Sequence, residues 1–226
     1  MVCIKQCGNF LYRCYKTVIS LRSEPDLEEE MEDFVKLATK LHGHLSPGVA
    51  LGIRMGQVGL KRLGLPKGDK RLFAVVETTL CLADGVQAST GCTLGHASLR
   101  IEDFGKLAFC LARSDTKSKV RVILKRVAQS PLINDWMMRK RKLNRGDEEE
   151  LTKELLRLDE SFFQVDEVTV EPLSQFDESE IIECEKCGEV LVEAKAVRKK
   201  GKNLCKACSG LRHYTRLVKT EEVKTG

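Results

Sequence analysis

The sequence predicts an α+β fold, with helices packed on a mainly antiparallel sheet and a small cysteine-rich domain at the C-terminal end. Three observations lead to this prediction. The chain has 226 residues, which suffices for one ordinary domain and a small second one. Helical patterns come first, short strand patterns follow and helices return, an order that favours α+β over a repeated βαβ unit. Two C-x2-C pairs lie near the end of the chain, from Cys184 to Cys208.

The first predicted helix covers residues 24–42. Ser23 is a suitable N-cap, and Gly43 is suited to end the helix. The apolar residues fall at helical spacing on one face, opposite acids and lysines. They are Leu27, Met31, Phe34, Ala38 and Leu41.

A second helix is predicted to begin at Ser46, which caps it with Pro47 in the first helical position, and to end at Gly64. Three glycines, at positions 48, 52 and 56, are four residues apart and therefore share one face. Each glycine costs a helix about 1 kcal/mol relative to alanine. This cost indicates that another backbone approaches the glycine face closely.

Short strands are predicted at residues 71–78, 99–104, 106–113, 119–125 and 163–173. Between the first two lies a stretch rich in small residues that carries Cys81 and Cys92. Residues 132–162 read as two helices joined near Gly146, and the basic run from Arg139 reads as the exposed side of a helix. The predicted domains are an N-terminal segment (1–22), an α+β core (23–173), a linker (174–183) and a four-cysteine zinc-finger domain (184–226).

Composition excludes several classes of protein. Charged residues make up 31% of the chain, and no apolar stretch approaches the ~20 residues that span a bilayer. We expect no membrane partner, no signal peptide and a cytoplasmic location. Ten cysteines without a secretory signal favour metal ligands or thiol chemistry over disulfides. The spacing of Cys3, Cys7 and Cys14 matches no common cluster motif, so we interpret these three as incidental.

The C-terminal cysteines form the strongest local signal. Cys184 and Cys187, then Cys205 and Cys208, make two C-x2-C pairs separated by seventeen residues. Two residues between thiolates allow both sulfurs to reach one ion from a tight turn, and this loop length suits a treble-clef-like or zinc-ribbon-like unit. The pattern predicts a structural zinc ion, with rubredoxin-type iron as the main alternative. Four thiolates leave no open position for chemistry.

A basic patch surrounds this predicted zinc site. A basic zinc module can hold phosphate backbones, so nucleic acid is one candidate partner. A solvated face and an acidic protein partner are the alternatives. The residues that define this patch are Arg198, Lys199, Lys200 and Lys202.

A second candidate site lies in the core. His42 and His44 are two residues apart, so in an extended segment both rings point the same way, just ahead of a helix N-terminus. They are candidates for a metal or catalytic site, although two histidines in a turn are more often structural. Cys81 and Cys92 add soft donors, and each alone also fits a small buried hydrophobe.

Three blocks in order carry a resemblance: HGHLSPGVALGIRMG, ETTLCLADGVQASTGCTLGH and DFGKLAF. Together they resemble the FmdE/FwdE family of formylmethanofuran dehydrogenase over residues 27–124, and more weakly to 172. The resemblance implies an α+β core that forms an intertwined homodimer. It also implies a pocket in which His44 and Cys92 are the metal-binding or reactive groups, with Lys106 supplying positive charge. The other implied pocket residues are His42, Ser46, Cys81, Asp84, Gln87, Thr90 and Thr93.

An imidazole and a thiolate together suit zinc or another late first-row metal, so the resemblance implies a second metal ion in the core. Ser46 departs from the family pattern, which usually has cysteine there. A serine hydroxyl stays protonated and is a poor ligand for a soft metal, so thiol chemistry at this position is in doubt. His96 stands where lysine or arginine is expected, and either replaces the lost ligand or lies at the surface.

Two functions remain open from the sequence. One is a metal-binding accessory protein of the FmdE type, linked to one-carbon (CO2/methanofuran) metabolism and to the other formylmethanofuran dehydrogenase subunits. The chain holds no pterin-binding region, so it is not expected to carry the redox chemistry alone. The alternative is a zinc-finger protein that binds nucleic acid or protein and has a degenerate core site. Electron transfer through a cysteine-bound iron is a third, weaker idea.

Overall fold

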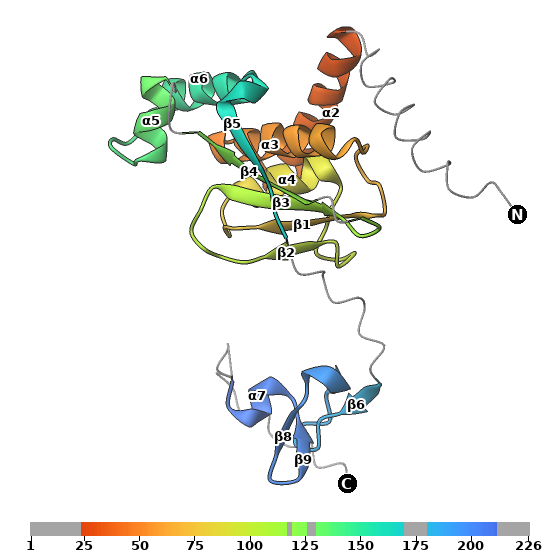
Figure 1. The fold of residues 1–226 in the computed structure, drawn as a ribbon. Coiled ribbons are helices and arrows are strands. Elements are labelled where there is room, and N and C mark those ends of the chain that lie inside the picture. Colours follow the sequence, from red (N-terminus) through yellow and green to blue (C-terminus); the bar gives the residue numbers. More distant parts are fainter. Residues whose placement is uncertain (1–23, 117–118, 126–129, 170–179, 212–226) are drawn as a thin grey trace, which may run out of the picture. The chain divides into compact units, whose positions relative to one another are not determined.

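The computed structural model describes residues 24–116, 119–125, 130–169 and 180–211 (Figure 1). The chain divides into two compact units, Met1–Leu173 and Ser174–Gly226, which are called the core unit and the tail unit below. The predictions for the segment 1–22, for its three cysteines and for most of the linker lie outside the described residues. The domain boundaries therefore stay predictions.

The core unit is built on a five-stranded sheet in the order β2-β1-β3-β4-β5. Its strands are β1 (Leu72–Val76), β2 (Leu99–Ile101), β3 (Ala108–Arg113), β4 (Lys119–Leu124) and β5 (Phe163–Glu167). All neighbours are antiparallel except β1 and β2, which pair in parallel. The predicted α+β class with a mainly antiparallel sheet is confirmed.

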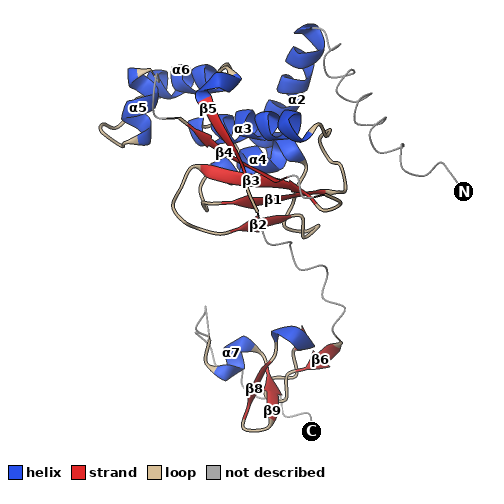
Figure 2. Ribbon diagram, viewed as in Figure 1, coloured by secondary structure: helices blue, strands red, loops and turns tan. Residues whose placement is uncertain are grey.

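The parallel pair requires a crossover, and α4 (Leu82–Thr90) provides it. The sequence analysis assigned no helix to this small-residue stretch. Helices α2 (Glu24–His42), α3 (Pro47–Leu63) and α4 lie on one face of the sheet (Figure 2). The core unit is therefore two layers, helices on a sheet.

The predicted limits of α3 are confirmed. The Ser46 hydroxyl accepts a hydrogen bond from the Val49 backbone N–H at 3.4 Å, and Pro47 is the first helical residue. Gly64 ends the helix in the left-handed region at φ 65°. These local signals set the position at which the chain turns from His44 into the helix.

The glycine face of α3 packs against α4 of the same chain. A Cβ atom at Gly48 would lie 2.9 Å from the Cβ of Cys81, and one at Gly52 would lie 2.3 Å from the Leu82 carbonyl oxygen. At Gly56 it would lie 1.9 Å from Ser89 Oγ. The predicted close approach of another backbone is confirmed, and the matching order of contacts shows that α3 and α4 run in the same direction.

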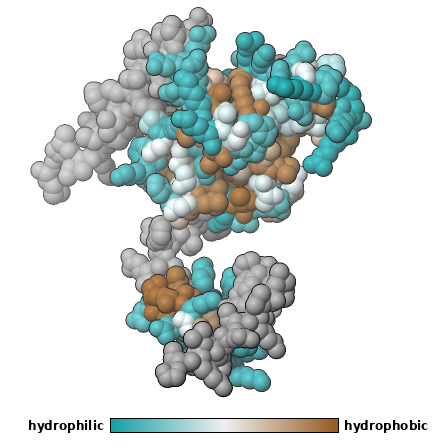
Figure 3. Space-filling view, turned by 180° about the vertical axis from the view of Figure 1, so that it is seen from behind, coloured by the Kyte–Doolittle hydropathy of each residue, from teal (hydrophilic) through white to brown (hydrophobic). Residues whose placement is uncertain are grey.

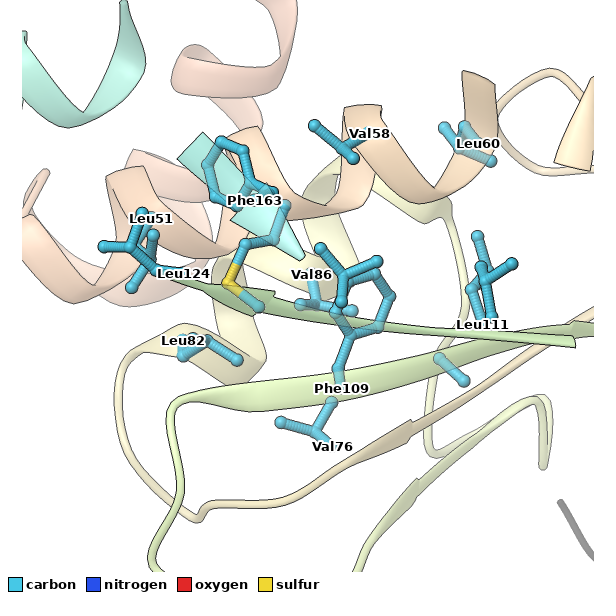
Figure 4. Packing of buried hydrophobic residues seen from close by; sticks show 14 of the residues in the cluster. Leu51, Val58, Leu60, Val76, Leu82, Val86, Phe109, Leu111, Leu124 and Phe163 are labelled. Carbon is cyan, nitrogen blue, oxygen red and sulfur yellow. The ribbon is translucent and has the colours of Figure 1, made fainter. Parts of the chain in front are cut away.

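The apolar core lies between these helices and the sheet. Phe109 and Leu111 of β3 point toward the helices, where they pack with Leu51 of α3 and Val86 of α4 (Figure 4). All four side chains are fully buried. Burial of a side chain of this size contributes about 1.5–3 kcal/mol to folding.

The predicted joint near Gly146 is wrong. Helix α5 (Pro131–Met137) ends early, and α6 (Arg145–Leu156) begins with a capping box in which Asn144 and Asp147 exchange hydrogen bonds. Gly146 therefore lies inside the first turn of α6. The basic run from Arg139 lies in the connection between the two helices and not on a helix face, which corrects the prediction.

The tail unit consists of two short strand pairs and one helical turn. β6 (Ile181–Glu183) pairs with β7 (Val190–Val192), and β8 (Val197–Lys199) pairs with β9 (Lys202–Leu204). A helical turn, α7 (Lys206–Ser209), follows, and the rest of the predicted terminal helix lies outside the described residues. Apolar side chains gather on the surface of this unit in Figure 3, and Ile181 and Val190 are strongly exposed.

The described helices can also be compared with the dimensions of a bilayer. None of them is both long enough and apolar enough to span one.

Candidate functional site

The four tail cysteines converge on one point. The Sγ atoms of Cys184, Cys187, Cys205 and Cys208 all lie within 4.8 Å of one another. A tetrahedral zinc ion with Zn–S bonds of ~2.3 Å separates its sulfur ligands by about 3.8 Å. The Sγ atoms of Cys187 and Cys205 are 3.9 Å apart, so the donor set fits such an ion.

Tight turns bring the sulfurs together. The Gly188 backbone N–H closes the first turn on the Cys184 carbonyl at 2.9 Å, with Gly188 in the left-handed region at φ 73°. The Cys205 backbone N–H donates to the Cys184 sulfur at 3.2 Å, and the Cys208 N–H donates to the Cys205 sulfur at 3.3 Å. Such N–H···S bonds fix the orientation of metal ligands and favour their thiolate form.

Two of these thiols differ strongly in acidity. The Cys205 backbone N–H is the largest contribution that lowers the pKa of Cys184, to about 6. Burial, followed by the neighbouring sulfurs, raises the pKa of Cys208 to about 12. Four thiolates cannot be held this close without compensation, because like charges repel each other. A divalent cation at the centre provides that compensation.

The basic patch lies on the β8–β9 hairpin. Lys200 and Gly201 form its turn with φ of 52° and 78°. Arg198, Lys199, Lys200 and Lys202 are all exposed, and none of them forms an ion pair with another described residue. Lys199 Nζ donates to the Ser209 carbonyl at 3.1 Å. The hairpin therefore presents most of its positive charge to solvent.

In the core, several predicted pocket residues lie around the N-terminal ends of α3 and α4. His42 Nδ1 and Asp84 Oδ2 are 2.6 Å apart, and the ring centres of His42 and His44 are 5.0 Å apart. Ser46 caps α3, and Cys81 is the residue before α4. The His42–Asp84 pair joins residues that are 42 positions apart in the sequence.

Cys92 lies at the opposite end of α4. It follows Gly91, which ends the helix at φ 76°, and its side chain is 2% exposed. A nine-residue helix that rises ~1.5 Å per residue is about 13 Å long, so within one chain Cys92 is far from His44. Burial raises the pKa of the Cys92 thiol to about 11, and Thr90 Oγ1 accepts a hydrogen bond from its backbone N–H at 3.2 Å. The structure thus separates the two residues that the resemblance assigns to one metal.

The remaining predicted pocket residues are dispersed. Gln87 lies on the second turn of α4, and Thr93 lies beyond the helix near Cys92. His96 is exposed, and its backbone N–H donates to Thr93 Oγ1 at 3.1 Å, so it lies near Cys92 and not near Ser46. Lys106 is exposed in the loop before β3. Among the described residues, the four tail cysteines are the only cluster of three or more potential metal ligands.

The sequence analysis missed a buried ion pair on the sheet. Glu77 is 8% exposed, and Arg121 donates to its two carboxylate oxygens at 2.6 and 2.9 Å. Cys110 lies beside this pair, and burial raises the pKa of its thiol to about 11, with the Glu77 charge contributing. The signal was present as an acid that directly follows the apolar run LFAVV and an arginine inside the alternating strand KVRVIL.

Comparison with known proteins now identifies the family. Residues 41–170 match the family model described as FmdE, molybdenum formylmethanofuran dehydrogenase operon, which is more than half of the chain. The chain belongs to the FmdE family. The resemblance drawn from the three sequence blocks is therefore confirmed.

Two individual relatives show how similar the chain is to known proteins. A crystal structure of a tungsten formylmethanofuran dehydrogenase FmdE-like protein from Syntrophus aciditrophicus is similar with a TM-score of 0.65 and 28% identity, over 82% of this chain and 95% of that one. A protein from Archaeoglobus fulgidus, named probable S-adenosyl-L-methionine-binding protein, is 32% identical over 210 residues. That alignment covers 83% of this chain and 55% of the relative, so the chain spans about half the length of its curated relative.

Proposed function

We propose that this protein is a metal-binding accessory protein of the FmdE type, which serves one-carbon (CO2/methanofuran) metabolism beside the subunits of a formylmethanofuran dehydrogenase. The observation that carries this proposal is the convergence of four cysteine sulfurs within 4.8 Å in a chain whose core matches the FmdE model. A homodimer and a cytoplasmic location stay predictions from the sequence and its resemblance.

The tail ion in this proposal is zinc with a structural role. Four thiolates at tetrahedral spacing are the donor set of structural zinc sites and fill every coordination position. The ion would fix the positions of the two strand pairs and α7. Chemistry on a bound substrate therefore belongs elsewhere in the chain or in its partners.

The core site in this proposal lies at the N-terminal ends of α3 and α4. Asp84 receives the Nδ1 side of His42 and so leaves Nε2 available as a metal ligand or proton acceptor. His44 and Cys81 are the nearest further donors, and Ser46 replaces a soft ligand by a hydroxyl. Cys92 is better explained as a buried core residue, because it lies at the other end of α4.

Metal analysis of the full-length protein, purified without oxygen, tests both sites. We expect one zinc per chain that is lost in Cys184→Ser with Cys208→Ser. A second metal ion is expected at the core site and is lost in His42→Ala with His44→Ala. His96→Ala is the matched control, since it removes an exposed imidazole outside the site. Full zinc content in the double cysteine variant would contradict the tail site, and a metal content unaffected by the two histidine changes would contradict the core site.

Binding to nucleic acid is a second candidate function. The exposed cations of the β8–β9 hairpin, unpaired within the part of the chain that the structure describes, favour it. We expect salt-dependent retention on immobilised DNA or RNA that is lost in Arg198→Ala with Lys199→Ala and Lys200→Ala. Replacing Lys61, Arg62 and Lys70, which are exposed cations of the core unit, is the control of equal charge change. Equal retention of both variants would show a general charge effect and not a binding surface.

A further inference from the structure

A cavity of about 270 Å³ lies in the core unit, away from both candidate metal sites of the proposed function. It is formed between the first turn of α3, at Pro47, and the connection from α5 to α6. The basic run from Arg139 provides much of its lining. Neither proposed function uses this run.

The lining carries more positive than negative charge. Arg139, Arg141 and Lys142 face a single carboxylate, that of Glu148. Arg141 is already neutralised, because it contacts Asp135 at 3.2 Å and Asp147 at 2.5 Å. Arg139 and Lys142 are exposed and form no ion pair with any residue that the structure describes. Two cations are thus available to an anionic group in the cavity.

An aromatic surface completes the cavity. Trp136, from the last turn of α5, is half-buried and contributes to the lining. An indole ring supplies a flat apolar surface on which a planar ring can stack, and such stacking contributes about 1–3 kcal/mol per base in nucleic-acid complexes. The positive end of the 17-residue helix α3, near Pro47, favours an anion further.

The backbone at Arg139 shows that the arginine is not there for the fold. Helix α5 ends in a Schellman-type turn, in which the Arg139 N–H donates to the Trp136 carbonyl at 3.1 Å and the Lys140 N–H donates to the Asp135 carbonyl at 2.9 Å. Arg139 occupies the left-handed position of this turn at φ 49°. Glycine is favoured there, and a side chain costs about 1–2 kcal/mol. The arginine therefore stands where glycine would give a more stable helix end.

We propose that this cavity binds a small anionic ligand with a planar ring, of the mononucleotide class. The ring stacks on Trp136, and the phosphate group contacts Arg139 and Lys142. The volume lies just below the ~300–1,000 Å³ of typical ligand pockets, which suits one ring system with one anionic group and excludes a dinucleotide.

The chain offers a direct probe of this cavity, because Trp136 is its only tryptophan. Titration of the full-length protein with AMP is expected to change the tryptophan fluorescence in a saturable way, and calorimetry should give the same dissociation constant. Adenosine and inorganic phosphate, each carrying half of the recognised chemistry, are expected to bind at least tenfold more weakly. Absence of saturable binding, or phosphate binding as tight as AMP binding, would overturn the proposal.

Arg139→Gly separates binding from folding. Glycine relaxes the left-handed backbone, so the unfolding temperature should not fall, whereas loss of a charge-assisted hydrogen bond should weaken AMP binding about tenfold or more. Lys142→Ala is expected to act in the same direction. Arg145→Ala is the matched control, because Arg145 is 93% exposed, pairs with Glu149 and lies outside the cavity. AMP affinity that is unchanged in both cavity variants, or reduced equally in the control, would show that the cavity is not the binding site.

Discussion

The core and tail units differ in what holds each of them together. In the core unit, buried apolar side chains extend from α2 to β5 and form the contacts between helices and sheet. In the described part of the tail unit, the buried apolar residues are Cys184 and Leu204. So small an apolar core does not stabilise an isolated unit of this size, and such units usually depend on a metal ion or disulfides. The comparison teaches that the tail needs its metal ion to fold, whereas the core does not.

The candidate ligands differ in the same way. In the tail, four donors converge because each C-x2-C pair forms a local turn and a short hairpin joins the two turns. In the core, the donors implied by the resemblance come from both ends of α4, and the contact between His42 and Asp84 depends on how α3 packs against α4. Local geometry thus produces a complete donor set in one unit and an incomplete one in the other.

Removal of the metal should have the largest effect, and should be confined to the tail. Binding of structural zinc in small metal-dependent domains is worth about 10–16 kcal/mol at neutral pH, so a strong chelator is expected to unfold the tail completely. Hydrogen exchange should show loss of protection in residues 180–211 and unchanged protection in the core strands. A core unfolding temperature that falls with the tail would break the comparison. Cys81→Ser is the control, since it removes a thiol outside the cluster and should leave the tail protected.

Gly52→Ala should have the next largest effect, and should be confined to the core. The new Cβ would lie 2.3 Å from the Leu82 carbonyl oxygen, and a backbone atom cannot move aside without separating α3 from α4. Overpacking of this kind costs about 3 kcal/mol, which chemical denaturation would measure. Metal content should stay at the wild-type value.

Gly59→Ala in the same helix is the matched control for that change. Its Cβ would meet only the side-chain ends of Leu111 and Phe109 at 3.2 Å, and alanine favours the helix by about 1 kcal/mol. We expect little net change in stability. Equal stability of the two variants would show that the glycine face does not control the packing of α3 on α4.

The features that could be predicted from the sequence are those with local causes. Ser46, Pro47 and Gly64 set the ends of α3 through contacts within a few residues, and the cysteine spacing sets the tail site. Helix α4 was missed because Gly85, Ser89 and Thr90 are weak helix formers. Its stability comes from packing against the α3 glycines, which no local pattern reveals.

The core site shows the same limit. The histidines and Asp84 were named together as pocket residues only through the resemblance, and their direct contact depends on the packing of two helices. The separation of Cys92 from His44 is likewise set by the length and direction of α4. The early end of α5 was missed because arginine, and not glycine, occupies its left-handed terminal position.

The Glu77–Arg121 ion pair should have the smallest effect of the three, and it sharpens the view that packing dominates in the core. The Arg121 guanidinium holds the pKa of the Glu77 carboxyl below its ordinary value of 4.5. Because the folded-state pKa is lower than the unfolded one, the pair stabilises the fold above pH 4.5, and this stability is lost as the pH falls through the folded value. Glu77→Gln is expected to lower stability at pH 7 by about 1–2 kcal/mol and to reduce the loss of stability on acidification. Denaturation midpoints from pH 7 to pH 3 measure both effects. Glu32→Gln, which removes an exposed carboxylate paired with Lys36 on α2, should leave both unchanged. A loss larger than that of Gly52→Ala would mean that the core depends on this charge pair more than on the packing of its helices.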